Sequence, residues 1–408
     1  MRILLSTRGS AGHLNPLAPF GHAALRAGHD VLVAAQGQHA GNVERAGLPL
    51  ARFGAPPPEQ WMPLLADFGA MDLDTANAVM IGEYFGRMDT AAALPGLRAI
   101  VEDWRPDVIV REGWEYASPL VAELHGIPVA RVALGLGAVE ALSIDLAAAA
   151  VDDARAELGL PPDPAGDRLR DTPFLTMIPE VLEDPAVPAP PRTHRFRHHV
   201  SADAPPLPGW WPGNDERALV YVTFGSVTAG EHLPYFPALY RAAIDALAPL
   251  PVRVLLTIGD HRDPAELGPL PANVHVEEWV AQDAVMPHAA AIVGHGGHGT
   301  TLGALAHGVP QVVVPLFSID QWANAAAVER AGAGVALDAD RGRRVLARPG
   351  PDVTDGLGPA VQRVLEDPSH GREARRIAAA MAAQPPVEAA LDVLSPPRRA
   401  PAASRARP

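Results

Sequence analysis

Two histidines stand among four glycines in Gly294–Thr301, which reads GHGGHGTT. The apolar run AAIV precedes this stretch, and the helix-like run TTLGALAHG continues it, which predicts a turn from a strand into a helix. Glycines let a backbone approach a ligand closely, and the first N–H groups of a helix attract an anion. The stretch therefore predicts a loop that holds a diphosphate.

Three other interpretations of this loop stay open. It satisfies G-x-G-x-x-G, and Asp320 follows slightly late for the acidic residue of an NAD site. Its two histidines could bind a metal, but no third ligand follows at close spacing. The acidic runs at 72–74 and 338–340 follow no strand beside the loop, so we expect no metal there. A tight turn without a ligand is the third alternative.

A second Gly-rich turn, TRGSAGHLNPL at 7–17, carries His13. Histidine titrates near neutral pH and can act as a general base when a carboxylate orients it. Glu112 directly follows the apolar run PDVIVR, so it should lie on the same rim of a sheet as His13. We expect these two residues to pair. A histidine hydrogen-bonded to backbone at a helix start is the alternative.

Apolar strand-like runs that alternate with helical stretches must position these residues. The strands are expected at 2–6, 30–35, 106–111, 127–134, 218–226, 252–259, 290–297 and 311–316. This alternation predicts parallel βαβ units, and hence two doubly wound α/β domains facing across a cleft. Proline-dense stretches between 160 and 216 break the pattern, because proline cannot serve a central strand. We expect an N-terminal domain over 1–203, a linker over 204–216, a C-terminal domain over 217–371 and a flexible tail over 395–408.

The composition excludes several kinds of chemistry. The chain has no cysteine, which excludes disulfides and thiolate nucleophiles. All 33 basic residues are arginine, so Schiff bases and the Walker A lysine are excluded as well. A net charge of −14 argues against nucleic acid as a partner. With no membrane-length apolar run and no signal peptide pattern, we expect a cytoplasmic protein.

The chain resembles family-1 glycosyltransferases of the GT-B fold, and most of all the actinobacterial branch that glycosylates polyketide, macrolide and enediyne antibiotics. The resemblance extends over nearly the whole chain, through GSAGHLNPL, PDVIVREGWEYASPLVAELHGIP, YVTFGS and the long run EEWVAQDAVMPHAAAIVGHGGHGTTLGALAHGVPQVVVPLFSIDQWANAAAVERAGAGVAL. It implies two Rossmann-like domains, and a helix over 372–394 that braces the N-terminal domain.

The resemblance also implies roles for single residues. His13 would deprotonate the acceptor hydroxyl, and Glu112 stands where many members have an aspartate that pairs with this histidine. The resemblance divides the residues of the donor site into those that would bind the diphosphate, the nucleobase and the sugar. These are Ser226, His295, Gly297, Gly299 and Thr300 for the diphosphate, Trp279 and Val280 for the base, Asp320 and Gln321 for sugar hydroxyls, and His298 for phosphate or base.

Gly303 departs from plant relatives, which carry there a glutamate that grips the ribose hydroxyls. Its loss favours a dTDP-sugar, whose deoxyribose has no 2′-hydroxyl. The implied reaction inverts the anomeric carbon and needs neither a metal nor another cofactor. A C-glycosyltransferase, a sugar-nucleotide epimerase and a catalytically silent partner of another glycosyltransferase remain alternatives.

The acceptor should lie against the segment 56–96, which reads as a long irregular stretch rich in methionine and aromatic residues. We expect contact with a hydrophobic aglycone from Trp61, Met62, Phe68, Met80, Tyr84, Phe85 and Met88. A minor hydrophobic core beneath a helix is the alternative for each of them. The expected partners are thus a sugar nucleotide and an aglycone, with a homodimer left open.

Overall fold

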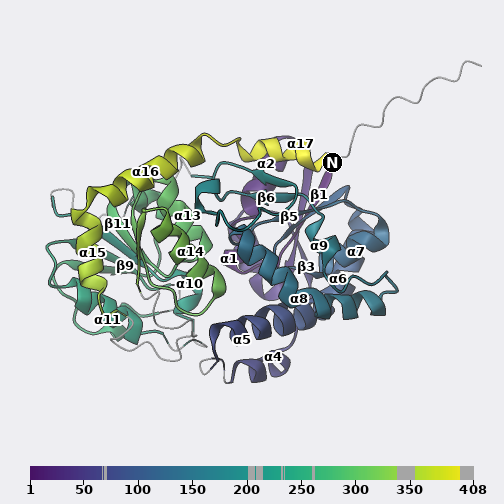
Figure 1. Cartoon of the computed structure of the whole chain (residues 1–408). Coiled ribbons are helices and arrows are strands. Elements are labelled where there is room, and N and C mark those ends of the chain that lie inside the picture. Colours follow the sequence, from purple (N-terminus) through teal and green to yellow (C-terminus); the bar gives the residue numbers. More distant parts are fainter. Residues whose placement is uncertain are drawn as a thin grey trace, which may run out of the picture.

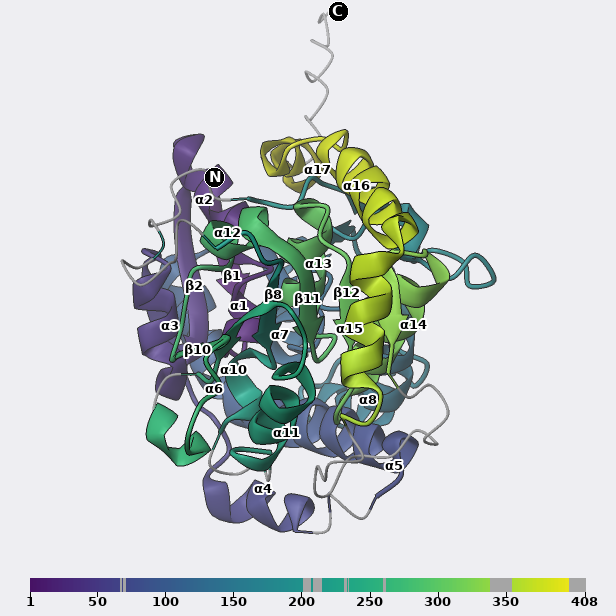
Figure 2. The ribbon, with the colours of Figure 1, turned by 90° about the vertical axis from the view of Figure 1, so that its left-hand side faces the viewer.

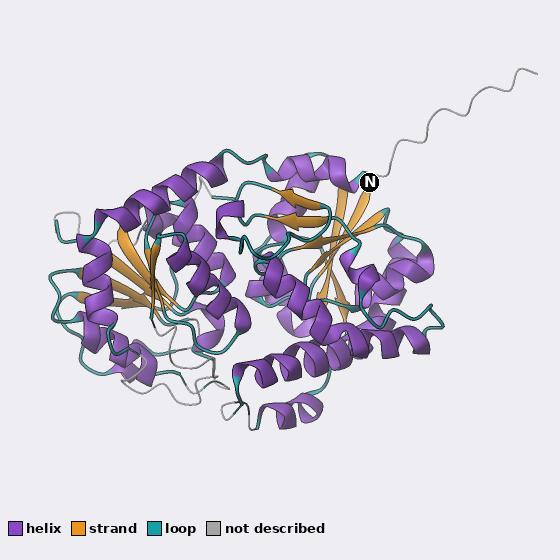
Figure 3. Cartoon of the chain, viewed as in Figure 1, coloured by secondary structure: helices purple, strands orange, loops and turns teal. Residues whose placement is uncertain are grey.

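The first half of the chain folds around a parallel sheet (Figure 1). The computed structural model describes residues 1–66, 68, 71–200, 207, 215–230, 233, 235–259, 262–337 and 354–395. The strands of the first sheet follow in the order β3 (Leu50–Phe53), β2 (Asp30–Gln36), β1 (Arg2–Ser6), β4 (Val108–Glu112), β5 (Val129–Val132), β6 (Phe174–Thr176) and β7 (Thr193–Arg195). Every residue of β4 is buried, as expected where helices cover both faces of a sheet (Figure 3).

Helices connect these strands and pack on both sides of the sheet (Figure 3). They are α1 (Ala11–Leu14), α2 (Ala18–Arg26), η1 (Gly37–His39), α3 (Ala40–Arg45), α4 (Pro58–Leu65), α5 (Leu73–Asn77), the π-helical η3 (Ala78–Asp89), α6 (Thr90–Trp104), α7 (Ala117–His125), α8 (Gly137–Glu157), α9 (Asp167–Arg170) and η4 (Glu180–Leu182). Helix α7 ends at Gly126, whose positive φ of 66° closes the helix.

The second half repeats this architecture. Its parallel strands follow in the order β10 (Val274–Glu277), β9 (Arg253–Thr257), β8 (Leu219–Thr223), β11 (Ala289–Gly294), β12 (Gln311–Val313) and β13 (Gly334–Ala336). Its helices are α10 (Gly225–Thr228), α11 (Ala238–Leu247), η5 (Pro264–Leu267), α12 (Gln282–Val285), η6 (Met286–His288), α13 (His298–Ala306), α14 (Ile319–Arg330), α15 (Leu357–Glu366), α16 (Pro368–Ala382), η8 (Val387–Ala389) and α17 (Ala390–Leu394). Two doubly wound α/β domains are therefore confirmed.

The C-terminal helices return to the first domain, as Figures 1 and 2 show in yellow. Arg26 of α2 forms an ion pair with Glu388 of η8, and the Arg197 amide donates to the Pro385 carbonyl at 2.7 Å. The expected single helix over 372–394 is wrong in one respect, because Pro385 and Pro386 interrupt it between α16 and η8.

Two further expectations were wrong. Where the structure describes it, the segment 56–96 is mostly helical rather than irregular, and Gly82 serves packing. A Cβ on Gly82 would lie 2.9 Å from the Leu146 carbonyl oxygen, so the glycine lets η3 approach α8 closely. The proline-dense stretch after 160 contributes β6 and β7, where β7 takes the sheet edge. Most of the expected linker and tail, and the run 338–340, lie outside the described residues.

Each sheet reverses its strand order between its first and fourth strands in sequence. In open α/β sheets, ligands bind at the carboxyl ends of the strands at this point. In the first domain the reversal lies between β1 and β4, which lead to His13 and Glu112. In the second it lies between β8 and β11, which lead to Ser226 and His295. Both predicted constellations thus lie at the position where this topology binds ligands.

Candidate active site

His13 and Glu112 form a hydrogen-bonded pair at the reversal point of the first sheet. Nδ1 of His13 lies 2.8 Å from Oε1 of Glu112, whose side chain is fully buried. A carboxylate only accepts hydrogen bonds, so Nδ1 of neutral His13 donates, which leaves Nε2 as the basic nitrogen. The His13 side chain is 13% exposed, so a substrate can reach the imidazole.

The surroundings of Glu112 keep it ionised. Burial raises the pKa of its carboxyl, but the charge of His13 and its hydrogen bond lower it, and the net pKa lies below the ordinary value. The Trp114 amide donates to Oε2 at 2.6 Å, and the Arg8 amide donates to Oε1 at 3.4 Å. The first domain therefore holds a carboxylate with a lowered pKa behind its histidine.

Aromatic rings enclose the other side of His13. Its ring meets Phe85 edge-on at a centroid distance of 6.0 Å and Trp114 at 5.9 Å, and these two rings stack on each other at 5.7 Å. The row continues through Tyr84, 5.3 Å from Phe85, to Trp61, 5.6 Å from Tyr84. Three of the residues predicted for the acceptor therefore lie in one row that ends at His13.

The remaining predicted acceptor residues are not brought to His13 by any described contact. Phe68 and Met80 pack against the main hydrophobic core, Met88 is half-buried, and Met62 is 50% exposed on α4. Asp72, from the acidic run 72–74, accepts from the Thr75 amide at 2.8 Å and caps α5.

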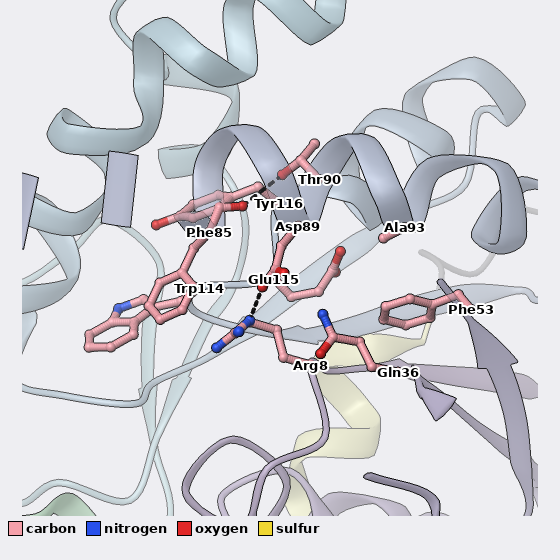
Figure 4. A pocket seen from close by; sticks show the side chains of 10 residues that line it. All are labelled: Arg8, Gln36, Phe53, Phe85, Asp89, Thr90, Ala93, Trp114, Glu115 and Tyr116. Atoms are coloured by element: carbon pink, nitrogen blue, oxygen red, sulfur yellow. Dashed lines mark hydrogen bonds and ion pairs between the residues drawn. The ribbon is translucent and has the colours of Figure 1, made fainter. Parts of the chain in front are cut away.

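A small pocket adjoins the aromatic row and contains residues that the sequence reading missed (Figure 4). Trp114 and Arg8 line it together with Phe85 and Asp89. The Arg8 guanidinium pairs with Asp89 and lies 3.9 Å from the centre of the Phe85 ring. Trp114 stands two residues after Glu112, and Arg8 follows directly on β1 and the threonine after it. Arg8 and Trp114 both follow the carboxyl end of a strand, and this position in the sequence could have indicated that they belong to the site.

The loop GHGGHGTT follows β11 and opens α13, as the sequence predicted. The His295 ring is wedged between two glycines: an added Cβ would lie 2.6 Å from its Cε1 atom at Gly225 and 2.4 Å from its Nε2 atom at Gly297. Gly225 precedes Ser226 in α10, so the two loops expected around a diphosphate lie together. Burial lowers the pKa of His295 to about 4, so the ring is neutral at pH 7.

Two side chains that the sequence reading did not select hold this loop in place. Asn324 of α14 donates to the Gly296 carbonyl at 2.8 Å, and Gln282 of α12 donates to the Thr300 hydroxyl at 3.2 Å. Gly296 has a φ of +85°, and a Cβ there would lie 2.7 Å from the Gln321 carbonyl oxygen. Glycine is therefore required at this position.

The residues expected at the nucleobase follow β10. Trp279 is 65% exposed, which leaves its ring available for stacking, whereas Val280 is buried. Gln282, which follows these two residues, lies beside α13: a Cβ on Gly303 would be 3.7 Å from its Oε1 atom. His298 begins α13, and burial, followed by the charge of His198, lowers its pKa to about 3.

Asp320 and Gln321, expected at the sugar, lie in the first turn of α14. Gln321 Oε1 accepts from the Leu316 and Phe317 amides at 2.9 and 3.0 Å, so its oxygen is already engaged and its nitrogen is the group left to donate. Asp320 bonds the Ser318 hydroxyl. Burial raises the pKa of Asp320, and nearby His13 acts against this shift.

The two domains meet at these residues. The Ile319 amide donates to Oδ1 of Asn77 at 3.4 Å, and a Cβ on Gly135 would lie 3.8 Å from the Asp320 Cβ. His13 of the first domain is thus close enough to Asp320 of the second to influence the pKa of its carboxyl. Among the described residues, no group of three or more His, Asp or Glu side chains could hold a metal ion. Within that same portion of the chain, no helix is long and apolar enough to cross a membrane.

Comparisons with known proteins agree with this geometry. Residues 23–177 match the family described as "Erythromycin biosynthesis protein CIII-like, N-terminal domain", and residues 241–395 match its C-terminal counterpart. L-demethylnoviosyl transferase of Streptomyces niveus is 33% identical, over 90% of this chain and 93% of the relative. 4'-demethylrebeccamycin synthase of Lentzea aerocolonigenes is 32% identical, over 96% of this chain and 98% of the relative.

Solved structures share the whole architecture. Spinosyn rhamnosyltransferase SpnG gives a TM-score of 0.79 at 22% identity, over 97% of this chain and all of that one, and so supports the fold alone. SsfS6 from Streptomyces sp. SF2575, solved with thymidine diphosphate, gives a TM-score of 0.73 at 27% identity, over 96% and 99% of the two chains.

Proposed function

The chain belongs to the actinobacterial antibiotic glycosyltransferases of family 1, which have the GT-B fold, and it transfers a sugar in natural-product biosynthesis. We propose that it moves this sugar from a dTDP-sugar to a hydroxyl of a hydrophobic aglycone, with inversion and without a metal ion. The observation that carries this proposal is the His13–Glu112 pair, which faces Asp320 across the domain interface.

In this reaction His13 acts as the general base. Its Nε2 takes the proton of the acceptor hydroxyl while the oxygen forms a bond to the anomeric carbon and the bond from that carbon to the diphosphate oxygen breaks. Glu112, ionised and fully buried, stabilises the imidazolium that results. A positioned general base contributes roughly 10²–10⁴-fold to such a reaction. Attack from the first domain and departure into the second invert the anomeric carbon.

Residues of the second domain stabilise the leaving group. Neutral His295 and the free N–H groups at the start of α13 donate to the departing diphosphate. In this proposal they supply the stabilisation that other glycosyltransferases draw from a divalent metal. Gln321 Nε2 and Asp320 hold sugar hydroxyls, and Trp279 stacks on the base.

The preference for thymidine rests on Gly303. Its Cβ direction points at Gln282, next to the Trp279–Val280 element, so a side chain here would reach the sugar of a nucleoside stacked on Trp279. Glycine offers no carboxylate to a ribose 2′-hydroxyl. The thymidine diphosphate bound by SsfS6 supports the same choice of nucleotide.

Thermal-shift titration with dTDP, UDP, GDP and NAD tests this assignment. We expect dTDP to stabilise the protein most, and the variant Gly303→Glu to raise the affinity for UDP relative to dTDP. Gly303→Ala is the matched control, because an added methyl group meets only Gln282 at an ordinary contact distance. Stabilisation by NAD alone, with none by dTDP, would contradict the proposal.

A further inference from the structure

Arg111 is a fully buried arginine that stands directly before Glu112 at the end of β4. The three residues before it in the strand are apolar, as expected for a strand covered on both faces. Its partner in the neighbouring strand β5 is Arg131, which is also buried, so two like charges lie side by side in the sheet. Burial, and to a smaller extent the charge of Arg111, lowers the pKa of Arg131 to about 10. Burying a charge is costly, so an arginine at this position calls for an explanation.

The guanidinium of Arg111 holds the turn 112–115, which follows β4. One of its terminal nitrogens donates to the carbonyl oxygens of Glu112, Gly113 and Glu115, at 3.0, 2.9 and 2.8 Å. Within the described part of the chain, its Nε atom and its other terminal nitrogen are buried without a hydrogen-bond partner. The centre of the Tyr116 ring lies 5.7 Å from the guanidinium carbon. The side-chain hydrogen bonds of Arg111 to these residues therefore all go to one turn.

Carboxyl groups hold the amide side of the same turn. Glu112 Oε2 accepts from the Trp114 amide at 2.6 Å. Glu115 Oε1 accepts from the Ala117 amide, at the start of α7, at 2.8 Å. Burial raises the pKa of Glu115, and the charge of Arg111 acts against this rise. The turn 112–115 is therefore fixed by a cation on its carbonyl side and by two carboxyl groups on its amide side.

Helix α8 lies directly against the turn at Gly113. A Cβ on Gly113 would lie 2.4 Å from Oε2 of Glu140, a fully buried residue of α8. Oε1 of the same carboxyl group accepts from the Leu134 amide at 2.7 Å, which fixes Glu140 in place. The turn 112–115 therefore has no room to move toward α8.

The position of this turn determines how far the Glu112 carboxylate lies from His13. Oε1 of Glu112 is 2.8 Å from Nδ1 of His13, so a displacement of the turn by about 1 Å would take the two atoms beyond hydrogen-bonding distance. The partner of one ring nitrogen selects which nitrogen of a neutral histidine carries the proton. Without the contact to Glu112, the proton of His13 would no longer be directed to Nδ1.

We propose that Arg111 is a positioning residue for the transfer reaction. By holding three carbonyl oxygens of the turn, it keeps Glu112 at the distance from which this residue directs the His13 proton to Nδ1. Arg111 is fully buried, so it acts through Glu112 and not on the substrate. This inference rests on the proposed function, in which Nε2 of His13 must be free to take the proton of the acceptor.

Nitrogen NMR of the protein labelled isotopically at histidine tests the inference without a substrate. Spectra are recorded at about pH 9, well above the ordinary pKa of histidine, and the His13 signals are those that disappear in His13→Ala. We expect wild-type His13 to carry its proton on Nδ1. In Arg111→Met this preference should be lost, and His13 should give a mixture of both tautomers.

Arg155→Met is the matched control. Arg155 is also buried and donates to a carbonyl oxygen, that of Pro161, at 2.6 Å. It lies near the opposite end of α8 from Glu140, so its replacement should leave the tautomer of His13 unchanged. If Arg111→Met does not fold, Arg111→Gln takes its place, because the glutamine amide is too short to reach the three carbonyl oxygens. It should give the same loss of preference.

A folded Arg111→Met in which His13 keeps the proton on Nδ1 would overturn the inference. A loss of preference in Arg155→Met would overturn it as well, because the effect would then follow from the loss of any buried arginine. The Kd for dTDP, measured by calorimetry, should stay within about twofold of wild type in Arg111→Met. A parallel loss of dTDP binding would mean that Arg111 supports the whole fold and not Glu112 in particular. A proton on Nε2 of His13 in the wild type would instead contradict the proposed function.

Discussion

Nδ1 of His13 lies 2.8 Å from Oε1 of Glu112, although 99 positions separate the two residues in the sequence. Strands β1 and β4 are neighbours in the sheet, with Ser6 opposite Arg111, so their carboxyl ends deliver both residues to one place. Glutamate is one methylene longer than the aspartate that the family resemblance implies for many members at this position. The distance shows that the longer side chain still reaches the imidazole.

Replacement of Glu112 by glutamine tests what its charge contributes. The amide keeps the shape but removes the charge that stabilises the imidazolium, so kcat should fall by about 10²-fold or more. Steady-state transfer kinetics measure the loss. Glu112→Asp keeps the charge at a greater distance and should retain more activity than Glu112→Gln. Equal activity of wild type and Glu112→Gln would show that the carboxylate has no role in the reaction.

The His295 ring lies tightly between Gly225 and Gly297. We therefore predict that a side chain added at Gly297 weakens donor binding. In Gly297→Ala the new methyl group would lie 2.4 Å from the His295 Nε2 atom and must displace the ring. We expect the Kd for dTDP, measured by calorimetry, to rise about tenfold or more. Gly303→Ala, inside the helix that Gly297 caps, meets no such contact and should bind dTDP normally. Normal binding by Gly297→Ala would mean that His295 does not contact the diphosphate.

The lowered pKa of His295 predicts how this residue affects stability in acid. Its ordinary pKa is 6.5 and its pKa in the folded protein is about 4, so between these values the unfolded chain binds more protons. The histidine therefore lowers the free energy of unfolding as the pH falls from 6.5 toward 4, by up to about 1.4 kcal/mol per pH unit.

The comparison of wild type with His295→Asn isolates this effect from the other groups that titrate in the same range. Buried carboxyls with raised pKa, such as Asp320, act in the opposite direction in both proteins. Urea unfolding at pH 7.5 and pH 5 should show the variant gaining stability relative to wild type at the lower pH. A difference that does not change with pH would contradict a buried, neutral His295.

Much of this arrangement could be predicted from local patterns. The apolar runs located β1, β2, β4, β5, β8, β9, β11 and β12, and the Gly-rich turns located both reversal points. The helical η3 was missed because the segment 56–96 was predicted to be irregular, whereas Gly82 and Gly86 allow η3 to pack closely against α8. Glycine is ambiguous in this way whenever its reason is a contact with a distant element.

The pocket beside His13 could not be predicted from local sequence patterns. Gln36 ends β2 and Asp89 ends η3, and nothing in the local sequence of either indicates that they face each other. Their approach depends on the packing of η3 over the sheet. Trp114, by contrast, was within reach of the sequence, because it follows Glu112 at a strand end that was already predicted to be functional.

The central claim is that His13 is the base of the transfer reaction and has no part in holding the nucleotide. The variant His13→Ala, supplied with a dTDP-sugar and an acceptor, tests it through two readouts on one protein. We predict that transfer falls by at least about 10²-fold, while the Kd for dTDP stays within about twofold of wild type. Transfer at the wild-type rate, or a parallel loss of dTDP binding, would contradict the claim.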